Sequence, residues 1–318
     1  METAEEFKKN FDKVYYGEII PAIRPLENER KTALAKCILF SVLCTIVTIP
    51  TLYLFFFSDA MFLNLSAKTL GDILFIPLLI AIVLGLIPFN IAKNFENKIK
   101  NKIMPTLLKG LKYFYWSEYE SMLTDTEINA TQLYGAFNRR YDDDLFEGEY
   151  KGVKISICET AIGLETGSGK NRTYTQRFKG VFVELNVDKN YKGHTNIKSH
   201  QLINLKPKDF EEVILEDVEF QKKYKVYSTD QIEARYVLTT AFIERFKNLG
   251  FAFKASKTEA SINGNKIIIA LSCNYDLFKV AKVTKTICDY EQFKSMAYEF
   301  ASILLLIETL KLDEKIGL

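Results

Sequence analysis

Residues that build metal and nucleophilic centres are scarce in this chain. Histidine occurs only at His194 and His200, and no CxxC pair or HExxH motif is present. The five cysteines are scattered and odd in number, so the sequence indicates neither a disulfide framework nor a zinc site. We therefore expect no metal, no cofactor, two solvent-exposed histidines, and reduced, mostly buried thiols in a reducing compartment.

A strong excess of one charge is also missing. The 42 lysines and arginines nearly balance the 40 aspartates and glutamates, which leaves a formal net charge of +2. A chain this close to neutral has no global attraction for a nucleic acid. Its many phenylalanines and tyrosines alternate as core residues and do not follow a basic stripe, so we expect no nucleic-acid partner.

Charge is absent altogether from two long stretches. Cys37–Phe57 contains no charged residue, and as a helix it would extend about 30 Å, close to the thickness of a bilayer's hydrocarbon core. A second uncharged run covers Ile73–Ala92. Proline interrupts both runs, which membrane helices tolerate better than soluble ones. We predict transmembrane helices at 37–57 and 73–92; the alternative is a pair of buried helices in a soluble core.

Basic residues flank these runs unevenly. The connecting segment 58–72 carries only Lys68, whereas seven basic residues precede the first run and six follow the second, up to Lys112. The positive-inside rule then places a short loop outside and both termini in the cytoplasm, as in a multi-pass protein of the cell (cytoplasmic) membrane. We read residues 1–36 as a cytoplasmic helical leader, in which Thr3 and Glu6 fit a capping box, and 93–125 as a juxtamembrane helix.

From about Thr126 the pattern changes to short alternating segments. Gly152–Ile157 and Phe178–Val187 alternate apolar and polar residues, as half-buried strands do. Three further segments are predicted as strands: Val213–Leu215, Tyr224–Tyr227 and Phe251–Phe253. Asn263-Gly264 between apolar runs predicts a two-residue hairpin turn, because both positions tolerate positive φ.

Two helices complete this part. Thr240–Leu249 is predicted as a short helix ended by Gly250. The last helix, from Asp289 to about Leu312, has an apolar stripe and a capping box of Asp289 with Gln292. The predicted fold class is α+β: an N-terminal two-helix transmembrane hairpin, followed over 126–318 by a cytoplasmic antiparallel-sheet domain with packed helices.

The stretch ETGSGKNRTY, Glu165–Tyr174, superficially resembles a phosphate-binding loop. A P-loop needs four residues between its glycines and a serine or threonine after the lysine. Here five residues separate Gly163 from Gly169, and Asn171 follows Lys170. The stretch also joins two predicted strands instead of a strand and a helix. We therefore interpret it as the tip of a β-hairpin.

Acidic residues give the remaining candidates for chemistry. We interpret the run Asp142–Asp144 as a solvated turn. In Leu215–Phe246, Asp230 and Glu233 have capping-box spacing, and Arg235 is placed to pair with an acidic side chain nearby. A structural role is the simpler interpretation of these side chains. The candidates for a binding or catalytic role are Asp144, Glu159, Asp230, Glu233 and Arg235.

Four blocks give the chain a family resemblance: Asp142–Thr160, Arg177–Thr195, Glu216–Thr239 and Glu308–Gly317. In this order, behind a two-span N-terminal hairpin, they resemble the bacterial domain of unknown function 3137 family. The resemblance implies an inner-membrane protein with a single α+β domain in the cytoplasm. It supplies no activity, since the family is named for lacking one.

Two functions from different classes follow. The first is a non-enzymatic binding or scaffolding module at the cytoplasmic membrane face, with the bilayer and a protein or anionic lipid as partners. The alternative is a membrane-tethered enzyme that uses an acidic site, with or without a metal ion, which requires the candidate carboxylates to converge. Transport is a third option, although two spans without internal charge provide no polar path. Sequence leaves the oligomeric state open.

Overall fold

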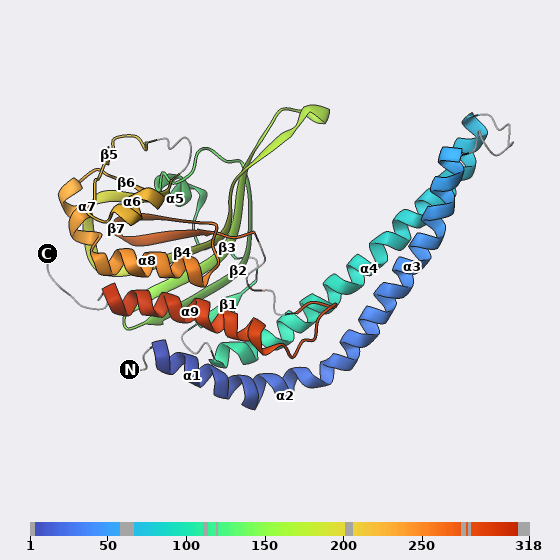
Figure 1. The fold of residues 1–318 in the computed structure, drawn as a ribbon, viewed down its shortest axis with the longest axis horizontal. Helices are drawn as coiled ribbons and strands as arrows, with labels where there is room; N and C mark the ends of the chain where they lie inside the picture. The colour runs from blue at the N-terminus through green and yellow to red at the C-terminus, as the bar shows by residue number, and fades with distance from the viewer. Residues whose placement is uncertain are drawn as a thin grey trace. The chain divides into compact units, whose positions relative to one another are not determined.

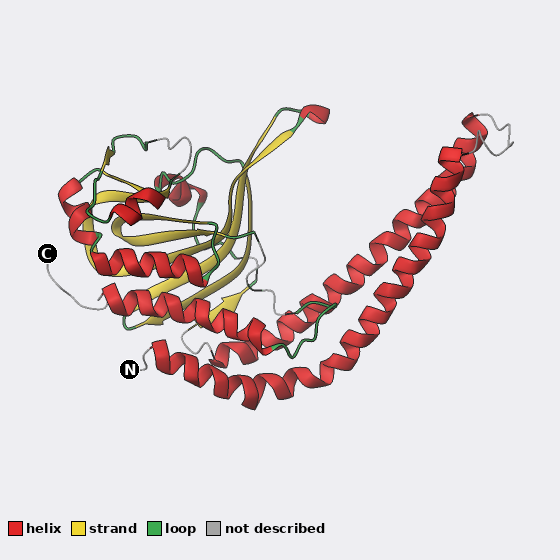
Figure 2. Ribbon diagram, in the orientation of Figure 1, coloured by secondary structure: helices red, strands yellow, loops and turns green. Residues whose placement is uncertain are grey.

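The computed structural model describes residues 4–57, 67–110, 114–118, 120–200, 206–274, 278 and 281–310 (Figure 1, Figure 2). The chain divides into two compact units. The sheet unit contains the residues up to Val14, Leu108–Phe278 and those from Lys294 on. The helical unit contains Tyr15–Leu107 and Lys279–Phe293. The Thr3 end of the predicted first capping box lies outside the described residues.

The helical unit is dominated by two long helices. The chain enters it from α1 (Ala4–Val14) through the π-helical turn η1 (Tyr15–Ile19), α2 (Ile20–Ile23) and the 3-10 turn η2 (Arg24–Leu26). The long helices are α3 (Glu27–Phe57) and α4 (Ala67–Gly110), and each contains a whole predicted span. The leader is therefore helical, as predicted. Internal prolines do not divide either long helix.

Small residues lie where α3 and α4 meet. The thiol of Cys37 donates to the carbonyl oxygen of Pro88 at 3.4 Å, and that of Cys44 to the carbonyl oxygen of Ala81 at 3.3 Å. A Cβ built on Gly85 would lie 3.7 Å from the sulfur of Cys44. As residue numbers rise on α3 they fall on α4, so the helices form an antiparallel hairpin. Small side chains let helix backbones approach closely.

Apolar side chains cover the rest of both helices. The most apolar 18-residue windows have mean hydropathies of 2.2 and 2.6, and only 0% and 11% of those windows are buried. Ile46, Leu79 and Leu86 are 60%, 51% and 55% exposed. Both helices are thus long and apolar enough to cross a membrane, and neither has the burial of a soluble core helix.

A buried arginine fixes the segment before α9 to the start of α3. Arg30 donates to the carbonyl oxygen of Val283 at 2.8 Å and pairs with Glu27 at 2.7 Å. Glu27 also accepts from the backbone N–H of Ile287 at 3.3 Å. From α4, Glu96 accepts from the N–H of Val283 at 3.3 Å. Charged side chains therefore satisfy backbone groups of a segment without regular secondary structure.

The sheet unit is built on a seven-stranded sheet in which all strand pairs are antiparallel. The order is β1-β2-β3-β4-β6-β5, and β7 pairs with β4 off this path. The strands are β1 (Phe114–Ser117), β2 (Arg139–Tyr150), β3 (Val153–Thr166), β4 (Thr173–Ser199), β5 (Glu211–Glu212), β6 (Tyr224–Ser228) and β7 (Lys257–Ser272). The long strand β4 pairs with β3 over Thr173–Asn186 and with β6 over Thr195–Ser199.

Helices and turns fill the connections. They are α5 (Asp125–Ala130), the 3-10 turn η3 (Gly169–Asn171), α6 (Val218–Lys223), α7 (Gln231–Val237), α8 (Thr240–Ala252) and α9 (Tyr290–Leu310). In Figure 1, α8 and α9 run along one side of the sheet. Phe300 of α9 packs edge-on against Phe114 and Phe146, with ring centroids 4.8 and 5.1 Å apart. The predicted α+β class with an antiparallel sheet is confirmed.

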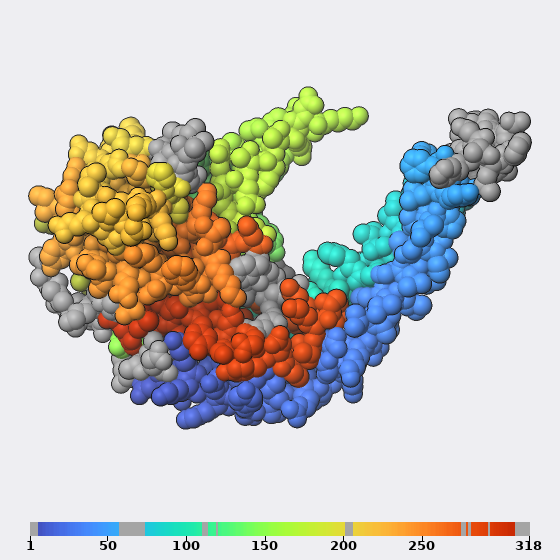
Figure 3. Space-filling view, in the orientation of Figure 1, coloured from blue at the N-terminus to red at the C-terminus, as the bar shows by residue number. Residues whose placement is uncertain are grey.

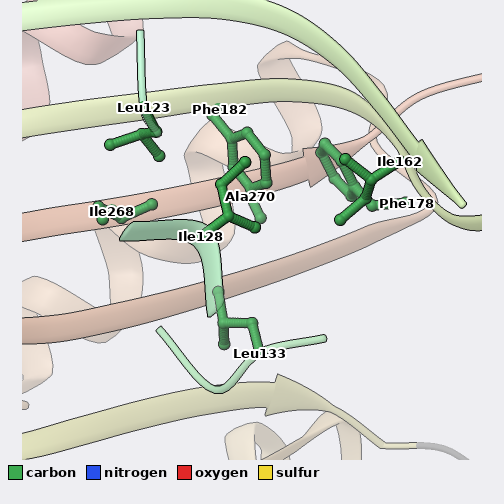
Figure 4. Packing of buried hydrophobic residues seen from close by; sticks show 8 residues of the cluster. All are labelled: Leu123, Ile128, Leu133, Ile162, Phe178, Phe182, Ile268 and Ala270. Carbon is green, nitrogen blue, oxygen red and sulfur yellow. The ribbon is translucent and has the colours of Figure 1, made fainter. Parts of the chain in front are cut away.

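The central strands are buried on both faces. On the second face a cluster forms beneath α5 and the segments that flank it, shown in Figure 4: Leu123, Ile128, Leu133, Ile162, Phe178, Phe182, Ile268 and Ala270. Phe178 and Phe182 are four residues apart on β4, so both point to the same face of the sheet. Their rings stack with centroids 4.5 Å apart. Burial on both faces explains the nearly continuous apolar run Ile267–Leu271 in β7.

The prediction of a helix across 93–125 is wrong in its second half. Helix α4 ends at Gly110, and Phe114–Ser117 forms strand β1 at the edge of the sheet, paired with Leu145–Gly148. Aromatic side chains favour a pleated, half-buried surface, and Phe114 is buried here while Tyr115 is exposed. The sheet unit therefore also extends beyond the 126–318 domain expected from sequence.

The predicted end of the helix at Gly250 and strand at Phe251–Phe253 are also wrong. Helix α8 continues to Ala252, and the chain leaves it through Lys254, whose φ of 46° is left-handed. Gly250 serves close packing instead, since a Cβ there would lie 2.4 Å from the hydroxyl oxygen of Thr258. A glycine chosen for space resembles a helix stop when only the sequence is known.

Asn263-Gly264 does not form a hairpin turn. Strand β7 runs through it, and Gly264 pairs with Tyr191 of β4 at a φ of 56°. The register slips between Asn186 and Tyr191 and again between Tyr191 and Thr195, so β4 carries extra residues there. A glycine with a left-handed φ is common both in such a bulge and in a turn. Here β7 continues along the long strand β4, so Gly264 forms part of a bulge.

Other predictions are confirmed. β4 and β6 contain the strands predicted at Phe178–Val187 and Tyr224–Tyr227, and β3 contains the strand predicted at Gly152–Ile157 from Val153 on. ETGSGKNRTY forms the end of the β3–β4 hairpin, where Thr166 pairs with Thr173, and it protrudes in light green in Figure 3. The prediction of a strand at Val213–Leu215 is wrong, because the strand in this region, β5, consists of Glu211–Glu212. Asp289 caps α9 by accepting from the N–H of Glu291 at 3.1 Å.

Candidate functional site

The run Asp142–Asp144 lies in strand β2, so its interpretation as a solvated turn is wrong. Asp142 accepts from the hydroxyls of Ser121 at 2.6 Å and Thr160 at 2.8 Å. Asp144 is 1% exposed and has a φ of 49° where the register with β3 shifts. The indole N–H of Trp116 donates to its carboxylate at 2.7 Å. The bulge thus turns Asp144 towards the edge strand, which it fixes in place.

Glu159 lies on β3 opposite Asp143 of β2 and is half-buried. It affects the thiol of Cys273: burial, together with the carboxylates of Glu299 and Glu159, raises the pKa of Cys273 to about 12. Burial likewise raises the pKa of the Cys158 thiol to about 11. Both thiols are therefore protonated near neutral pH and are poor nucleophiles.

Asp230, Glu233 and Arg235 belong to α7. Asp230 is its N-cap and accepts from the N–H groups of Ile232 at 2.9 Å and Glu233 at 3.0 Å. Glu233 does not complete the predicted capping box. Its two carboxylate oxygens accept from the N–H groups of Lys192 at 3.0 Å and Gly193 at 2.5 Å. These amides belong to the irregular part of β4, so Glu233 accepts the hydrogen bonds that a neighbouring strand would accept in a regular sheet.

The acidic partner predicted for Arg235 is also wrong. Its guanidinium donates to the backbone oxygen and side chain of Gln231 in the same helix, at 3.2 and 3.3 Å. Asp144 and Glu159 lie on β2 and β3, whereas the α7 residues contact Lys192 and Gly193, beyond the part of β4 that pairs with β3. The five candidates thus form two separate groups, and the chain does not bring them together in one cleft.

The two histidines differ in environment. His200 is exposed, as predicted. His194 is half-buried, so the prediction that it is solvent-exposed is wrong. Its Nε2 lies 2.7 Å from the hydroxyl of Ser261, and its ring packs edge-on against Phe210 with centroids 4.8 Å apart. Burial lowers the pKa of His194. Within the described ranges, no three His, Cys, Asp or Glu side chains form a group suited to a metal ion.

A concavity that no motif predicts lies at the far end of β4. It has a volume of about 670 Å³ and is formed by the end of β4, the α6–β6 junction, the end of α8 and the start of β7. We call it the lysine pocket, after its basic lining residues Lys222, Lys223, Lys247, Lys254, Lys257 and His200. No aspartate or glutamate is among its lining residues.

A smaller concavity of about 300 Å³ adjoins the lysine pocket. The two share Lys222 and Tyr224 as lining residues. Four of the nine residues that line the smaller one are aliphatic, and two of these, Ile214 and Val218, are each 63% exposed. Phe251, in the lining of the lysine pocket, is 72% exposed. Basic and apolar surface therefore occur side by side in this part of the sheet unit.

Residues 176–312 match a family described as "protein of unknown function (DUF3137)". The resemblance seen in the sequence is confirmed over that segment. The Asp142–Thr160 block, the helical hairpin and the last five residues of the Glu308–Gly317 block lie outside it. Among solved structures, the crystal structure of the mycobacterial trehalose monomycolate transport factor A, TtfA, is similar with 11% identity and a TM-score of 0.37, covering 66% of this chain and 95% of that one. No curated protein matches the chain.

Proposed function

Because the family matched by residues 176–312 is one of unknown function, we propose a function from the geometry of this chain. It is a membrane-anchored binding module: α3 and α4 span a cell membrane, and the sheet unit and both termini lie on its cytoplasmic side. The observation that carries this proposal is the apolar surface of the α3–α4 hairpin, whose most apolar windows are 0% and 11% buried. In water, so large an exposed apolar surface is rare unless something covers it.

A bilayer is the covering that fits this hairpin. Aliphatic and aromatic side chains surround it, and its seam is made of small residues, as in lipid-embedded helix pairs. No lysine, arginine, aspartate or glutamate occurs within Cys37–Phe57 or Ile73–Ala92. The basic residues that flank the two runs on their terminal sides supply the orientation.

Binding is favoured over catalysis by the roles of the candidate carboxylates. Asp230 caps a helix, Glu233 accepts from two strand amides, and Asp144 accepts from an indole N–H. Hydrogen bonds of this kind fix the side chains in structural roles, whereas a general acid or base needs access to substrate. The tethered-enzyme alternative therefore has no assembled set of groups to support it.

Extraction of membranes at alkaline pH tests the anchor. The full chain is expected to stay in the membrane pellet. A triple variant with Ile46→Lys, Leu79→Lys and Leu86→Lys places charges on the lipid-facing surface, at about 3 kcal/mol each near the helix centre, and is expected to be released or not inserted. The matched control, with alanine at the same three positions, keeps both runs uncharged and should remain in the pellet. Release of the unaltered chain would refute the anchor.

A further inference from the structure

We propose that the lysine pocket binds a phosphate-bearing anion. This inference deepens the proposed function by naming the chemistry that the binding module recognises. It is carried by the concentration of positive charge in one concave surface of a chain whose formal net charge is only +2. Concave surfaces lined by one sign of charge focus the electric field and raise the local concentration of counter-ions.

In the described part of the chain, only two of the five lysines in this pocket form a direct ion pair with a carboxylate. Lys247 pairs with Asp217 at 3.4 Å, and Lys222 pairs with Glu219 at 2.7 Å. For the other three lysines, Lys223, Lys254 and Lys257, no carboxylate of the described residues lies within ion-pair distance. Lys254 and Lys257 act only from a longer range, on the buried carboxylates of Glu299 and Glu259. Like charges held near one another destabilise the fold, and a bound anion relieves that repulsion.

The backbone at Lys254 strengthens the argument. Its φ of 46° falls in the left-handed region, which costs a non-glycine residue about 1 kcal/mol or more. Helices usually end on glycine in this conformation, and here the N–H of Ala255 closes the turn on the carbonyl oxygen of Gly250 at 2.9 Å. The chain thus carries a charged side chain at a position where glycine would fold more stably.

Size indicates that the phosphate is part of a larger molecule. A volume of about 670 Å³ is within the range of sites for drug-sized ligands. The ammonium groups supply several donors each, which suits the three or four oxygens of a phosphate. Exposed Phe251, together with Ile214 and Val218 of the adjoining concavity, provides contacts for an apolar portion. An anionic phospholipid headgroup fits both features, and a soluble phosphate ester shares the same anionic chemistry.

Lysine acetylation followed by mass spectrometry tests the proposal on the full chain. The protein is reconstituted in phosphatidylcholine nanodiscs, in the same nanodiscs with added inorganic pyrophosphate, and in nanodiscs that contain phosphatidylglycerol. At nine-tenths occupancy, Lys223, Lys254 and Lys257 are expected to react roughly tenfold more slowly than in phosphatidylcholine alone. The exposed lysines of β3 and β4, Lys154, Lys179 and Lys192, lie outside the pocket and are the internal control.

Two sets of variants measure the affinity for the protecting anion. Replacing Lys223, Lys254 and Lys257 by alanine is expected to weaken binding about 100-fold, because each basic side chain near an anionic surface contributes a factor of about five. Replacing Lys154, Lys179 and Lys192 by alanine should leave it unchanged. Lys254→Gly separates binding from folding: it should weaken binding about fivefold while raising the unfolding temperature, since it relieves the left-handed backbone.

Each outcome decides the proposal. Protection with phosphatidylglycerol identifies a lipid headgroup, and protection with pyrophosphate alone identifies a soluble phosphate compound; both support the anion site. If neither protects the three pocket lysines, or if the control lysines are protected equally, the proposal is overturned. Pyrophosphate binding needs no bilayer, so it can succeed even if alkaline extraction refutes the anchor, and the anchor can hold even if the pocket binds nothing.

Discussion

At pH 9, the Glu299→Gln variant is expected to have a free energy of unfolding about 4 kcal/mol larger than the unaltered protein, and at pH 5 a difference of less than about 1 kcal/mol. Glu299 lies on α9 and is 3% exposed. Burial raises its pKa from 4.5 to about 8, against the smaller opposing effects of the Ser295 hydroxyl and the Lys254 ammonium. One carboxylate oxygen, Oε2, has no hydrogen-bond partner in the described structure.

The sign of the pH dependence follows from that shift. Because the folded-state pKa is raised, the folded chain holds a proton that the unfolded chain releases above pH 4.5. The free energy of unfolding therefore falls as the pH rises from about 4.5 to about 8, and little further change from this group follows above that window. Glutamine keeps the shape of the protonated side chain and cannot ionise, so the variant lacks this loss.

Fluorescence of Trp116 reports the transition. It is the only tryptophan of the chain and lies in β1 of the sheet unit, where unfolding breaks its hydrogen bond to Asp144. Denaturant titrations of both proteins at pH 5, 7 and 9 give the difference. Glu244→Gln, on the exposed face of α8, removes the same charge and should leave the pH dependence as it is. Parallel pH curves for Glu299→Gln and the unaltered protein would show that Glu299 is not held protonated.

Gly180→Ala is expected to destabilise the sheet unit by more than about 3 kcal/mol, enough to prevent folding of a marginally stable chain. Gly180 lies in β4 between Thr160 of β3 and Ser272 of β7. Its φ is 153°, and a Cβ would lie 2.0 Å from the carbonyl oxygen of Leu271 and 2.7 Å from the nitrogen of Cys273. Those atoms are backbone in a paired strand, so they cannot move aside as a flexible side chain would.

The Gly264→Ala variant separates the cost of a left-handed backbone conformation from the cost of a steric clash. Gly264 also has a left-handed φ, 56°, but the atom nearest to a Cβ built there is the side-chain oxygen of Asn190, at 3.9 Å. Alanine there should cost only the conformational term, about 1–2 kcal/mol. Denaturant midpoints followed at Trp116 compare the two variants. Equal losses would mean that strands β4 and β7 are not as closely apposed as the structure shows.

Local patterns were sufficient wherever one segment determines its own structure. The absence of charge in Cys37–Phe57 and Ile73–Ala92 located the two apolar helices, and alternation located β3, β4 and β6. The stretch Glu165–Tyr174 was correctly interpreted as the tip of a β-hairpin, because it lacks the spacings that a phosphate-binding loop requires. Asp230 and Asp289 were identified as helix caps from their positions alone.

Prediction failed where a distant segment decides. From the sequence alone, Gly250 resembles a helix stop and Gly264 a residue of a hairpin turn. In the structure, the contact with Thr258 determines the role of Gly250, and pairing with the long strand β4 determines that of Gly264. Glu233 has capping-box spacing, yet the free amides of Lys192 and Gly193 attract its carboxylate. The lysine pocket had no signal of its own: Lys222 and Lys257 are far apart in sequence, and only the packing of α6, α8 and β7 brings them together.

A pair of reporters on the full chain tests whether two spans hold the sheet unit at the cytoplasmic face of a membrane. A fluorescent protein that matures only in the cytoplasm is fused after Leu318, and a phosphatase active only outside the cytoplasm is inserted between Phe57 and Ala67. Both reporters are expected to be active. A dark C-terminal fusion, or an inactive phosphatase in an otherwise stable chain, would contradict it.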